Sequence, residues 1–203
     1  QSQINPHFLF NTMESIRMDL WLKKEYEISE VIERFSTLLR KSIEWSDESN
    51  TIGHEIQLIE DYLKIQKYRY VNKFDYIISV GQEFYDYTIP KFTLQPIVEN
   101  AIYHGLELKN GKGCVTITAE FVGENIRIKV TDDGMGMKKE VLNALQNDLE
   151  GQDSVNGRKA RIGIKNVHQR LKLNYGNKYG LKFESQEGFG TQVEVLLPGI
   201  KQC

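Results

Sequence analysis

His7 is the residue whose chemistry first suggests an activity for this chain. It lies in the run Asn5–Asn11, which reads Asn-Pro-His-Phe-Leu-Phe-Asn and opens an amphipathic segment. Histidine has an unperturbed pKa of about 6.5, so its imidazole is mostly neutral at pH 7 and can act as a nucleophile toward phosphorus. Composition alone would favour an ordinary solvent-facing histidine. The phospho-acceptor interpretation therefore depends on whether a nucleotide site follows downstream.

Asn100 and His104 are the first downstream candidates. They are four residues apart in a predicted helix over Thr93–Leu106, so both project from one face, while Ile97 and Val98 supply the opposite, apolar face. An amide oxygen is a good ligand for Mg²⁺, which bridges nucleotide phosphates. Alone, Asn100 would more often be a surface polar residue, so the magnesium interpretation rests on the motifs that accompany it.

A second candidate is the run Asp132-Asp133-Gly134-Met135-Gly136, which follows a predicted strand. Glycines at 134 and 136 let the backbone come close to a flat ring, and a carboxylate accepts a hydrogen bond from an exocyclic amine. That combination suits adenine. A lone run of this kind is usually only a turn. Its place between the Glu99–Asn100 helix and the Gly188–Thr191 turn favours a nucleotide site.

With His7 upstream and these motifs in this order, the chain resembles the sensor histidine kinases. The Asn-Pro-His-Phe-Leu-Phe-Asn run is typical of the LytS/YesM-like subfamily, and the resemblance covers nearly all 203 residues. The nucleotide motifs resemble the site shared by gyrase-type ATPases, Hsp90-type chaperones, histidine kinases and MutL-type proteins (the GHKL group). The resemblance implies ATP and Mg²⁺, with Asn100 as the metal ligand. The nucleotide-binding residues that it implies are Asn100, His104, Asp132, Gly134, Gly136, Arg161, Gly163 and Thr191.

Within that resemblance, Asp132 is expected to contact adenine and Thr191 to support it by hydrogen bonding. Gly163 is expected at a helix start, where it would help to bind phosphate. The chain departs from the family in reading Arg161-Ile162-Gly163-Ile164 where relatives often have Gly-Ile-Gly-Leu, and Tyr103 where they often have lysine. Phosphate neutralisation would then fall to Mg²⁺, His104 and the lid cations. These are Arg158 and Lys159 in a lid loop predicted over Asn147–Ala160, and Arg161 directly after it.

Pro96 separates a kinase from a hydrolase. ATP-hydrolysing relatives place a water-activating glutamate four residues before the metal asparagine, and this chain has a proline there. Glu99 lies roughly 100° from Asn100 on an ideal helix, so it does not replace that group. We expect Glu99 to hold the second nitrogen of His7 instead, and Asn11 to orient a water for dephosphorylation of a partner. The alternatives are a GHKL-type hydrolase clamp and a catalytically degenerate nucleotide-binding scaffold.

The elements that must position these residues are read from periodicity. Two amphipathic helices joined at Lys23–Glu25 predict an antiparallel hairpin, which a second copy would complete as a four-helix bundle. The polar run Ser46–Asn50 predicts a boundary between a dimerisation and histidine phosphotransfer region, 1–50, and an ATP-binding catalytic domain, 51–203. Mixed helices and alternating strands in the second region predict an α+β fold, a two-layer α/β sandwich of the GHKL type with a mixed sheet.

Composition sets the remaining expectations. A net charge of −2 disfavours nucleic acid as a partner. No run approaches the roughly 20 apolar residues of a membrane helix, so we expect a cytoplasmic fragment whose full-length protein reaches the membrane through an N-terminal sensor region. Cys114 and Cys203 lack metal or redox spacing, and His54 and His168 are predicted to be surface residues. The expected partners are a second copy of the chain and the receiver domain of a response regulator.

Overall fold

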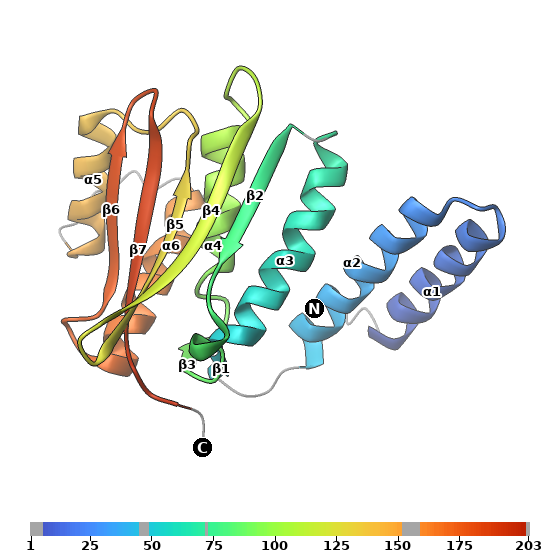
Figure 1. Cartoon of the computed structure of the whole chain (residues 1–203), viewed down its shortest axis with the longest axis horizontal. Coiled ribbons are helices and arrows are strands. Elements are labelled where there is room, and N and C mark those ends of the chain that lie inside the picture. The colour runs from blue at the N-terminus through green and yellow to red at the C-terminus, as the bar shows by residue number, and fades with distance from the viewer. Residues whose placement is uncertain (1–5, 45–48, 72, 152–158, 202–203) are drawn as a thin grey trace.

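A computed structural model describes residues 6–44, 49–71, 73–151 and 159–201. A helical hairpin lies beside an α/β sandwich, with the five-stranded sheet in front of its helices (Figure 1). Within the described residues no helix is long and apolar enough to cross a membrane.

The hairpin consists of α1 (Pro6–Leu22) and α2 (Tyr26–Glu44), as predicted. Lys24 takes a positive φ of 63° in the link, and the Ser29 hydroxyl donates to the Arg17 carbonyl at 3.2 Å across the two helices. Several large apolar side chains stay exposed on these two helices. They are Phe8, Ile16, Met18, Trp21, Leu22, Tyr26 and Phe35.

Helix α3 (Ile52–Arg69) is capped by Thr51, whose hydroxyl accepts a hydrogen bond from the His54 amide at 3.3 Å. Strand β1 (Ser49–Thr51) pairs antiparallel with β3 (Thr88–Pro90) just before this cap. This two-stranded sheet was not predicted, since three-residue strands carry too little alternation to detect.

The main sheet has the order β2 (Phe74–Ser79), β4 (Gly113–Val122), β5 (Asn125–Asp132), β7 (Gly190–Pro198) and β6 (Gly180–Gln186). Strands β2 and β4 are parallel and the other pairs are antiparallel, so the predicted mixed sheet is confirmed. Along β5 buried residues alternate with partly exposed ones, which places Ile126, Ile128 and Val130 against the helices.

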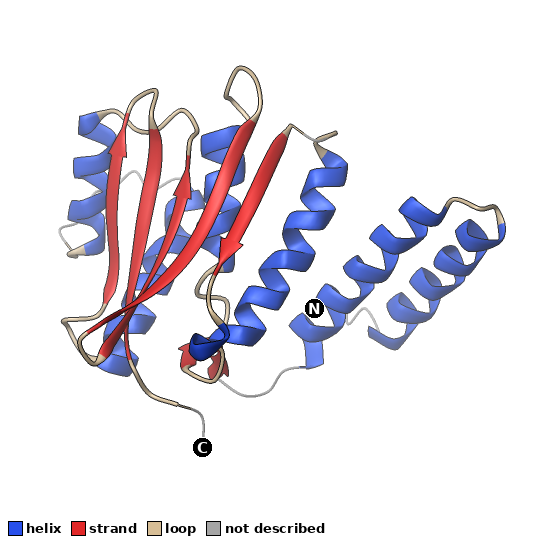
Figure 2. Ribbon diagram, in the orientation of Figure 1, coloured by secondary structure: helices blue, strands red, loops and turns tan. Residues whose placement is uncertain are grey.

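The helices α3, α4 (Gln95–Asn100), α5 (Lys139–Leu149) and α6 (Lys159–Tyr175) cover one face of the sheet (Figure 2). A short turn, η1 (Gln82–Phe84), precedes β3, and α4 continues directly into η2 (Ala101–Leu106). Side chains of all these layers form one core, including Leu63, Leu94, Ile97, Ile117 and Leu171.

Three predicted features differ in the structure. The helix expected over 93–106 begins at Gln95 and becomes a π-helix from Ala101, closed by a hydrogen bond from the Glu107 amide to the Ile102 carbonyl at 2.8 Å. The predicted lid is shorter, because α5 runs to Leu149 and α6 begins at Lys159; residues 152–158 lie outside the described residues.

His168 is buried rather than on the surface, with 3% of its area exposed. It lies one turn after Ile164 on the face of α6 that packs on β6, where its Nδ1 accepts the Leu181 amide at 3.0 Å. Burial, reinforced by the charge of Lys172, lowers the pKa of His168. The prediction failed because an imidazole can be buried when a backbone group pairs with it.

Glu55 connects α3 to the start of α4. Its buried carboxylate accepts hydrogen bonds from the amides of Phe92, Thr93 and Leu94, at 2.7, 3.0 and 3.1 Å. Phe92 has a positive φ of 52°, so this turn needs external support. Arg170 of α6 supports the same turn by donating a hydrogen bond to the Phe92 carbonyl at 3.1 Å. Three helices therefore meet at one turn.

We predict that Glu55→Gln lowers the free energy of unfolding by on the order of 2–3 kcal/mol, because its amide nitrogen must face at least one backbone donor. Glu60→Gln is the matched control, since Glu60 is a half-exposed carboxylate on the same helix that pairs with Lys64. Urea unfolding of both variants tests this. Equal unfolding midpoints for the two would show that the Glu55 contacts contribute nothing.

Candidate nucleotide site

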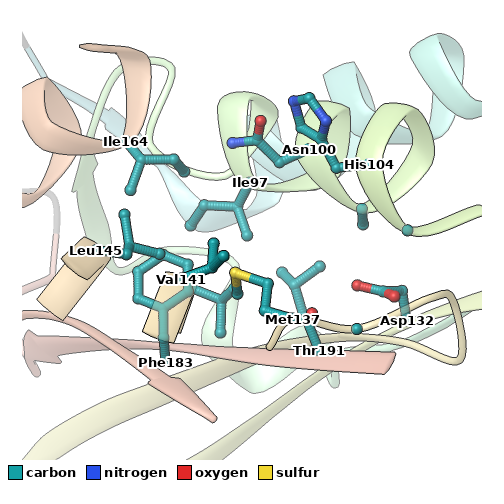
Figure 3. A pocket seen from close by; sticks show the side chains of 15 residues that line it. Ile97, Asn100, His104, Asp132, Met137, Val141, Leu145, Ile164, Phe183 and Thr191 are labelled. Atoms are coloured by element: carbon teal, nitrogen blue, oxygen red, sulfur yellow. The ribbon is translucent and has the colours of Figure 1, made fainter. Parts of the chain in front are cut away.

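A cavity of about 250 Å³ lies between the sheet and the helices α4, η2, α5 and α6 (Figure 3). Its walls combine a polar end with a longer apolar wall. The lining residues are Ile97, Asn100, Ala101, His104, Gly105, Val130, Asp132, Gly136, Met137, Val141, Leu145, Ile164, Phe183, Thr191 and Val193.

Asp132 is the last residue of β5, so its predicted place at the end of a strand is confirmed. It forms the polar end of the cavity and is 5% exposed. Its Oδ1 accepts the Gly134 amide at 2.9 Å, and the backbone of Thr191 also hydrogen-bonds to the carboxylate. Burial raises the pKa of Asp132 to about 6, although these two hydrogen bonds oppose the shift. A carboxylate offers roughly four acceptor positions, so capacity remains for a donor in the cavity.

Gly105 and Gly134 allow η2 to approach this carboxylate closely. A Cβ on Gly105 would lie 2.5 Å from Asp132 Oδ1, and one on Gly134 would lie 2.3 Å from the backbone of Gly105. The Met135 amide donates to the Gly105 carbonyl at 3.0 Å across this contact. Gly105 was not predicted as a site residue, although a glycine directly after His104 is a signal for close backbone approach.

Gly136 and Ser185 fix the turn that follows. Gly136 has a φ of 63°, and a Cβ there would lie 1.9 Å from the Gln186 carbonyl oxygen. The Ser185 hydroxyl accepts the Met137 amide and donates to the Gly190 carbonyl, each at 2.9 Å. Ser185 Oγ also lies 2.9 Å from the Thr191 hydroxyl. Thr191 therefore supports Asp132 through its backbone, while its side chain is held by Ser185.

Asn100 and His104 lie across the cavity from Asp132 (Figure 3). Within the described residues the Asn100 side chain makes no hydrogen bond, so its amide oxygen is available to a cation. No group of three or more His, Cys, Asp or Glu side chains in the described ranges is arranged to hold a metal ion. One amide oxygen completed by phosphates and water is nevertheless a donor set that Mg²⁺ accepts, so the residues present fit that ion.

The apolar wall was not predicted from the sequence. Met137, Val141 and Leu145 face the cavity from the turn and from α5, and Ile164 and Phe183 complete the wall from α6 and β6. These residues look like ordinary core positions in the sequence, because periodicity does not distinguish a packed face from a face that lines a cavity. A flat, largely apolar base fits such a wall.

The remaining predicted residues lie elsewhere. Gly163 is one turn inside α6 rather than at its start, and a Cβ there would lie 3.8 Å from Pro96 Cβ. The prediction that a helix starts at Gly163 was wrong, because α6 begins at Lys159, before the apolar repeat. Glu99 accepts a hydrogen bond from the Gln95 side chain at 2.9 Å and is not among the lining residues. The backbones of His7 and Arg161 belong to α1 and α6; their side chains lie outside the described residues, as do Arg158 and the Lys159 side chain.

Comparisons with known proteins agree with this geometry. The family described as "Histidine kinase" matches residues 1–74, and the family described as "Histidine kinase-, DNA gyrase B-, and HSP90-like ATPase" matches residues 86–200. The chain belongs to the sensor histidine kinases. The predictions of the LytS/YesM-like family and of the GHKL fold are thereby confirmed.

Three relatives illustrate the match. The chain is 35% identical to sensor histidine kinase YesM of Bacillus subtilis, over 98% of this chain and 32% of YesM. It is 36% identical to sensor histidine kinase YpdA of Escherichia coli, over 98% of this chain and 33% of YpdA. It is also 34% identical to the uncharacterised YwpD of Bacillus subtilis, over 97% of this chain and 68% of YwpD. The chain thus spans about a third of the length of YesM and YpdA.

Two solved structures show the same fold at low sequence identity. The catalytic domain of histidine kinase ThkA superposes with a TM-score of 0.55 at 14% identity, covering 76% of this chain and 99% of that domain. The histidine kinase domain of a blue-light activated kinase from Erythrobacter litoralis gives 0.53 at 17% identity, covering 85% and 75%.

We predict that Asp132→Asn lowers ATP affinity without lowering the stability of the free protein near pH 8. The folded-state pKa of Asp132 is raised to about 6, so the folded protein holds this proton more tightly than the unfolded chain does. The carboxylate therefore costs stability, at most about 3 kcal/mol, that is fully felt above pH 6 and disappears below the unfolded pKa near 4. Removing the charge should leave the melting temperature unchanged or higher.

Calorimetric ATP titration and thermal melts at pH 8 test both halves of this prediction. Unchanged ATP affinity in a variant that melts like the wild type would remove Asp132 from the adenine contact. Asp133→Asn is a suitable control, because Asp133 is more exposed and already paired with Lys109 at 3.0 Å.

Proposed function

We propose that this chain is the kinase core of a two-component sensor kinase, which transfers the γ-phosphate of ATP to His7 and then to an aspartate of a response regulator. The observation that carries the proposal is the placement of Asn100 opposite Asp132 in one cavity. The Asp132 carboxylate can accept a hydrogen bond from the exocyclic amine of adenine, and the free amide oxygen of Asn100 can bind the cation. A magnesium-bound adenine nucleotide requires both contacts.

In this proposal the cavity binds ATP and His7 provides the nucleophile. A bond forms between an imidazole nitrogen of His7 and the γ-phosphorus, and the bond from that phosphorus to the β,γ-bridging oxygen breaks, so ADP leaves. When bound, Mg²⁺ would neutralise charge on the phosphates, with Asn100 as its protein ligand. The protein's own contribution is mainly positioning. We further propose that Glu99 holds the second nitrogen of His7.

The hydrolase alternative lacks its usual base. Pro96 occupies the position four residues before Asn100 and has no titratable group. It packs toward Gly163 of α6, so this end of α4 is occupied by backbone and ring carbons. A kinase needs no water-activating group here, since the acceptor is itself the nucleophile.

The proposed partners follow from the hairpin and from the lengths of the relatives. The exposed apolar side chains of α1 and α2 would pack against a second copy in a four-helix bundle. We propose 1–50 as the dimerisation and phosphotransfer region and 51–203 as the catalytic domain. The full-length protein would add a sensor region at the membrane, and the receiver domain of a response regulator would take the phosphate.

We predict that His7→Gln abolishes acid-labile phosphorylation from γ-labelled ATP and leaves ATP affinity unchanged, because acceptor and nucleotide contacts lie on different elements. Gln keeps a polar side chain of similar reach, so the dimer should persist by light scattering. His54→Gln is the matched control, since His54 is an exposed histidine at the start of α3.

Acid-labile label that survives in His7→Gln would contradict the acceptor assignment. Release of inorganic phosphate by the wild type, without label on the protein, would favour the hydrolase clamp. Nucleotide binding with neither outcome would favour the degenerate scaffold.

We predict that Asn100→Ala weakens ATP binding in the presence of Mg²⁺ by about tenfold, and much less when the metal is removed by a chelator. The reason is that the lost group is a metal ligand and not a contact to the base. Titrating ATP with and without Mg²⁺ measures the difference. Equal losses under both conditions would make Asn100 a structural residue.

A further inference from the structure

Arg69, at the C-terminal end of α3, is held by aromatic residues beside the nucleotide cavity. Its Nη1 donates to the Tyr103 hydroxyl at 3.1 Å and its Nη2 to the Tyr70 hydroxyl at 2.8 Å. The guanidinium carbon lies 4.7 Å from the centroid of the Tyr70 ring and 5.5 Å from that of Tyr103. Both distances are within the range of cation–π attraction.

The charge of Arg69 is not neutralised within the described residues. Arg17, Arg34 and Arg127 each pair with a carboxylate, whereas no carboxylate in the described ranges lies within ion-pair distance of Arg69. The closest link is indirect, since the Tyr70 hydroxyl donates to Glu107 at 3.2 Å. A guanidinium has five N–H donors and two are used here. An exposed, oriented cation with spare donors is suited to an anion.

The position of Tyr103 puts this cation at the phosphate end of the cavity. Around the helix formed by α4 and η2, Gly105 faces Asp132 and Asn100 and His104 face the cavity. Tyr103, the residue before His104, lies on the side of this helix that faces α3, since its hydroxyl accepts a hydrogen bond from Arg69 there. A nucleotide whose base contacts Asp132 and whose metal contacts Asn100 would extend its terminal phosphates in this direction.

We propose that Arg69 binds the terminal phosphates of ATP, and that Tyr103 positions its guanidinium for that contact. This inference rests on the proposed function and adds a residue from α3, an element that contributes none of the lining residues of the cavity. Tyr70 supports the other edge of the guanidinium. The planar guanidinium of Arg69 is thereby held in one orientation before the nucleotide binds, which reduces the conformational entropy lost on binding.

The test compares ATP with adenosine in Arg69→Ala. We expect ATP affinity in the presence of Mg²⁺ to fall about tenfold or more, as for the loss of a charged hydrogen bond, while adenosine affinity stays unchanged. Lys67→Ala is the matched control, since Lys67 is a cation on the same helix that pairs with Asp75 at 2.6 Å. It should bind ATP like the wild type.

Two further variants separate positioning from a structural role. Tyr103→Phe keeps the ring and removes the hydroxyl, so it should lower ATP affinity less than Arg69→Ala does. In the double variant it should cause no further loss of ATP affinity beyond that of Arg69→Ala. Arg69→Lys should bind ATP more tightly than Arg69→Ala, because lysine keeps the positive charge but lacks the planar guanidinium with its paired donors.

Several outcomes would overturn the inference. One is an equal loss of ATP and adenosine affinity in Arg69→Ala, and another is a lower melting temperature with ATP affinity unchanged. Independent, additive effects of the Tyr103 and Arg69 substitutions would remove the positioning role. A wild-type protein that fails to bind ATP would instead contradict the proposed function itself, so the two failures are distinguishable.

Discussion

The close approach of η2 to the end of β5 is the constraint on which the site depends. Backbone atoms of Gly105 and Gly134 occupy space where any Cβ would collide, so the two segments meet without intervening side chains. Because Asn100 and His104 belong to the same helical unit as Gly105, this contact also sets where they lie relative to Asp132. The turn over Ala101–Leu106 is π-helical, so each hydrogen-bonded turn contains one residue more than in an α-helix. Such turns are frequent at functional sites.

The start of that helical unit is held by a second, buried interaction. The Glu55 carboxylate accepts hydrogen bonds from three backbone amides at the turn before α4. Arg170 donates to the Phe92 carbonyl of the same turn. Helix α3 is in turn joined to the hairpin, since Arg34 of α2 donates to Asp61 at 2.9 Å. A continuous set of polar contacts therefore runs from the hairpin through α3 to the helix that carries Asn100.

Periodicity in the sequence was sufficient for most elements, and it failed where long-range contacts decide the local structure. The hairpin, the mixed sheet and the positions of Asn100 and Asp132 follow from spacing and turn residues. The π-helical turn depends on the approach of Gly105 to a strand far along the chain. His168 is buried because the Leu181 amide of β6 donates a hydrogen bond to it. Ser185 holds the site through contacts of its hydroxyl with Met137, Gly190 and Thr191. None of these partners is adjacent in sequence, so no local pattern reports them.

Glu55 and Asp132 show why burial alone does not identify a functional carboxylate. Burial is the first cause of a raised pKa in both. The Glu55 oxygens accept hydrogen bonds from three backbone amides of one turn, so its role is structural. Within the described part of the chain, Asp132 accepts hydrogen bonds from Gly134 and Thr191 only, and it borders a cavity with an apolar wall. A buried charge that is only partly satisfied is costly, and a ligand that donates the missing hydrogen bond recovers that cost as binding energy.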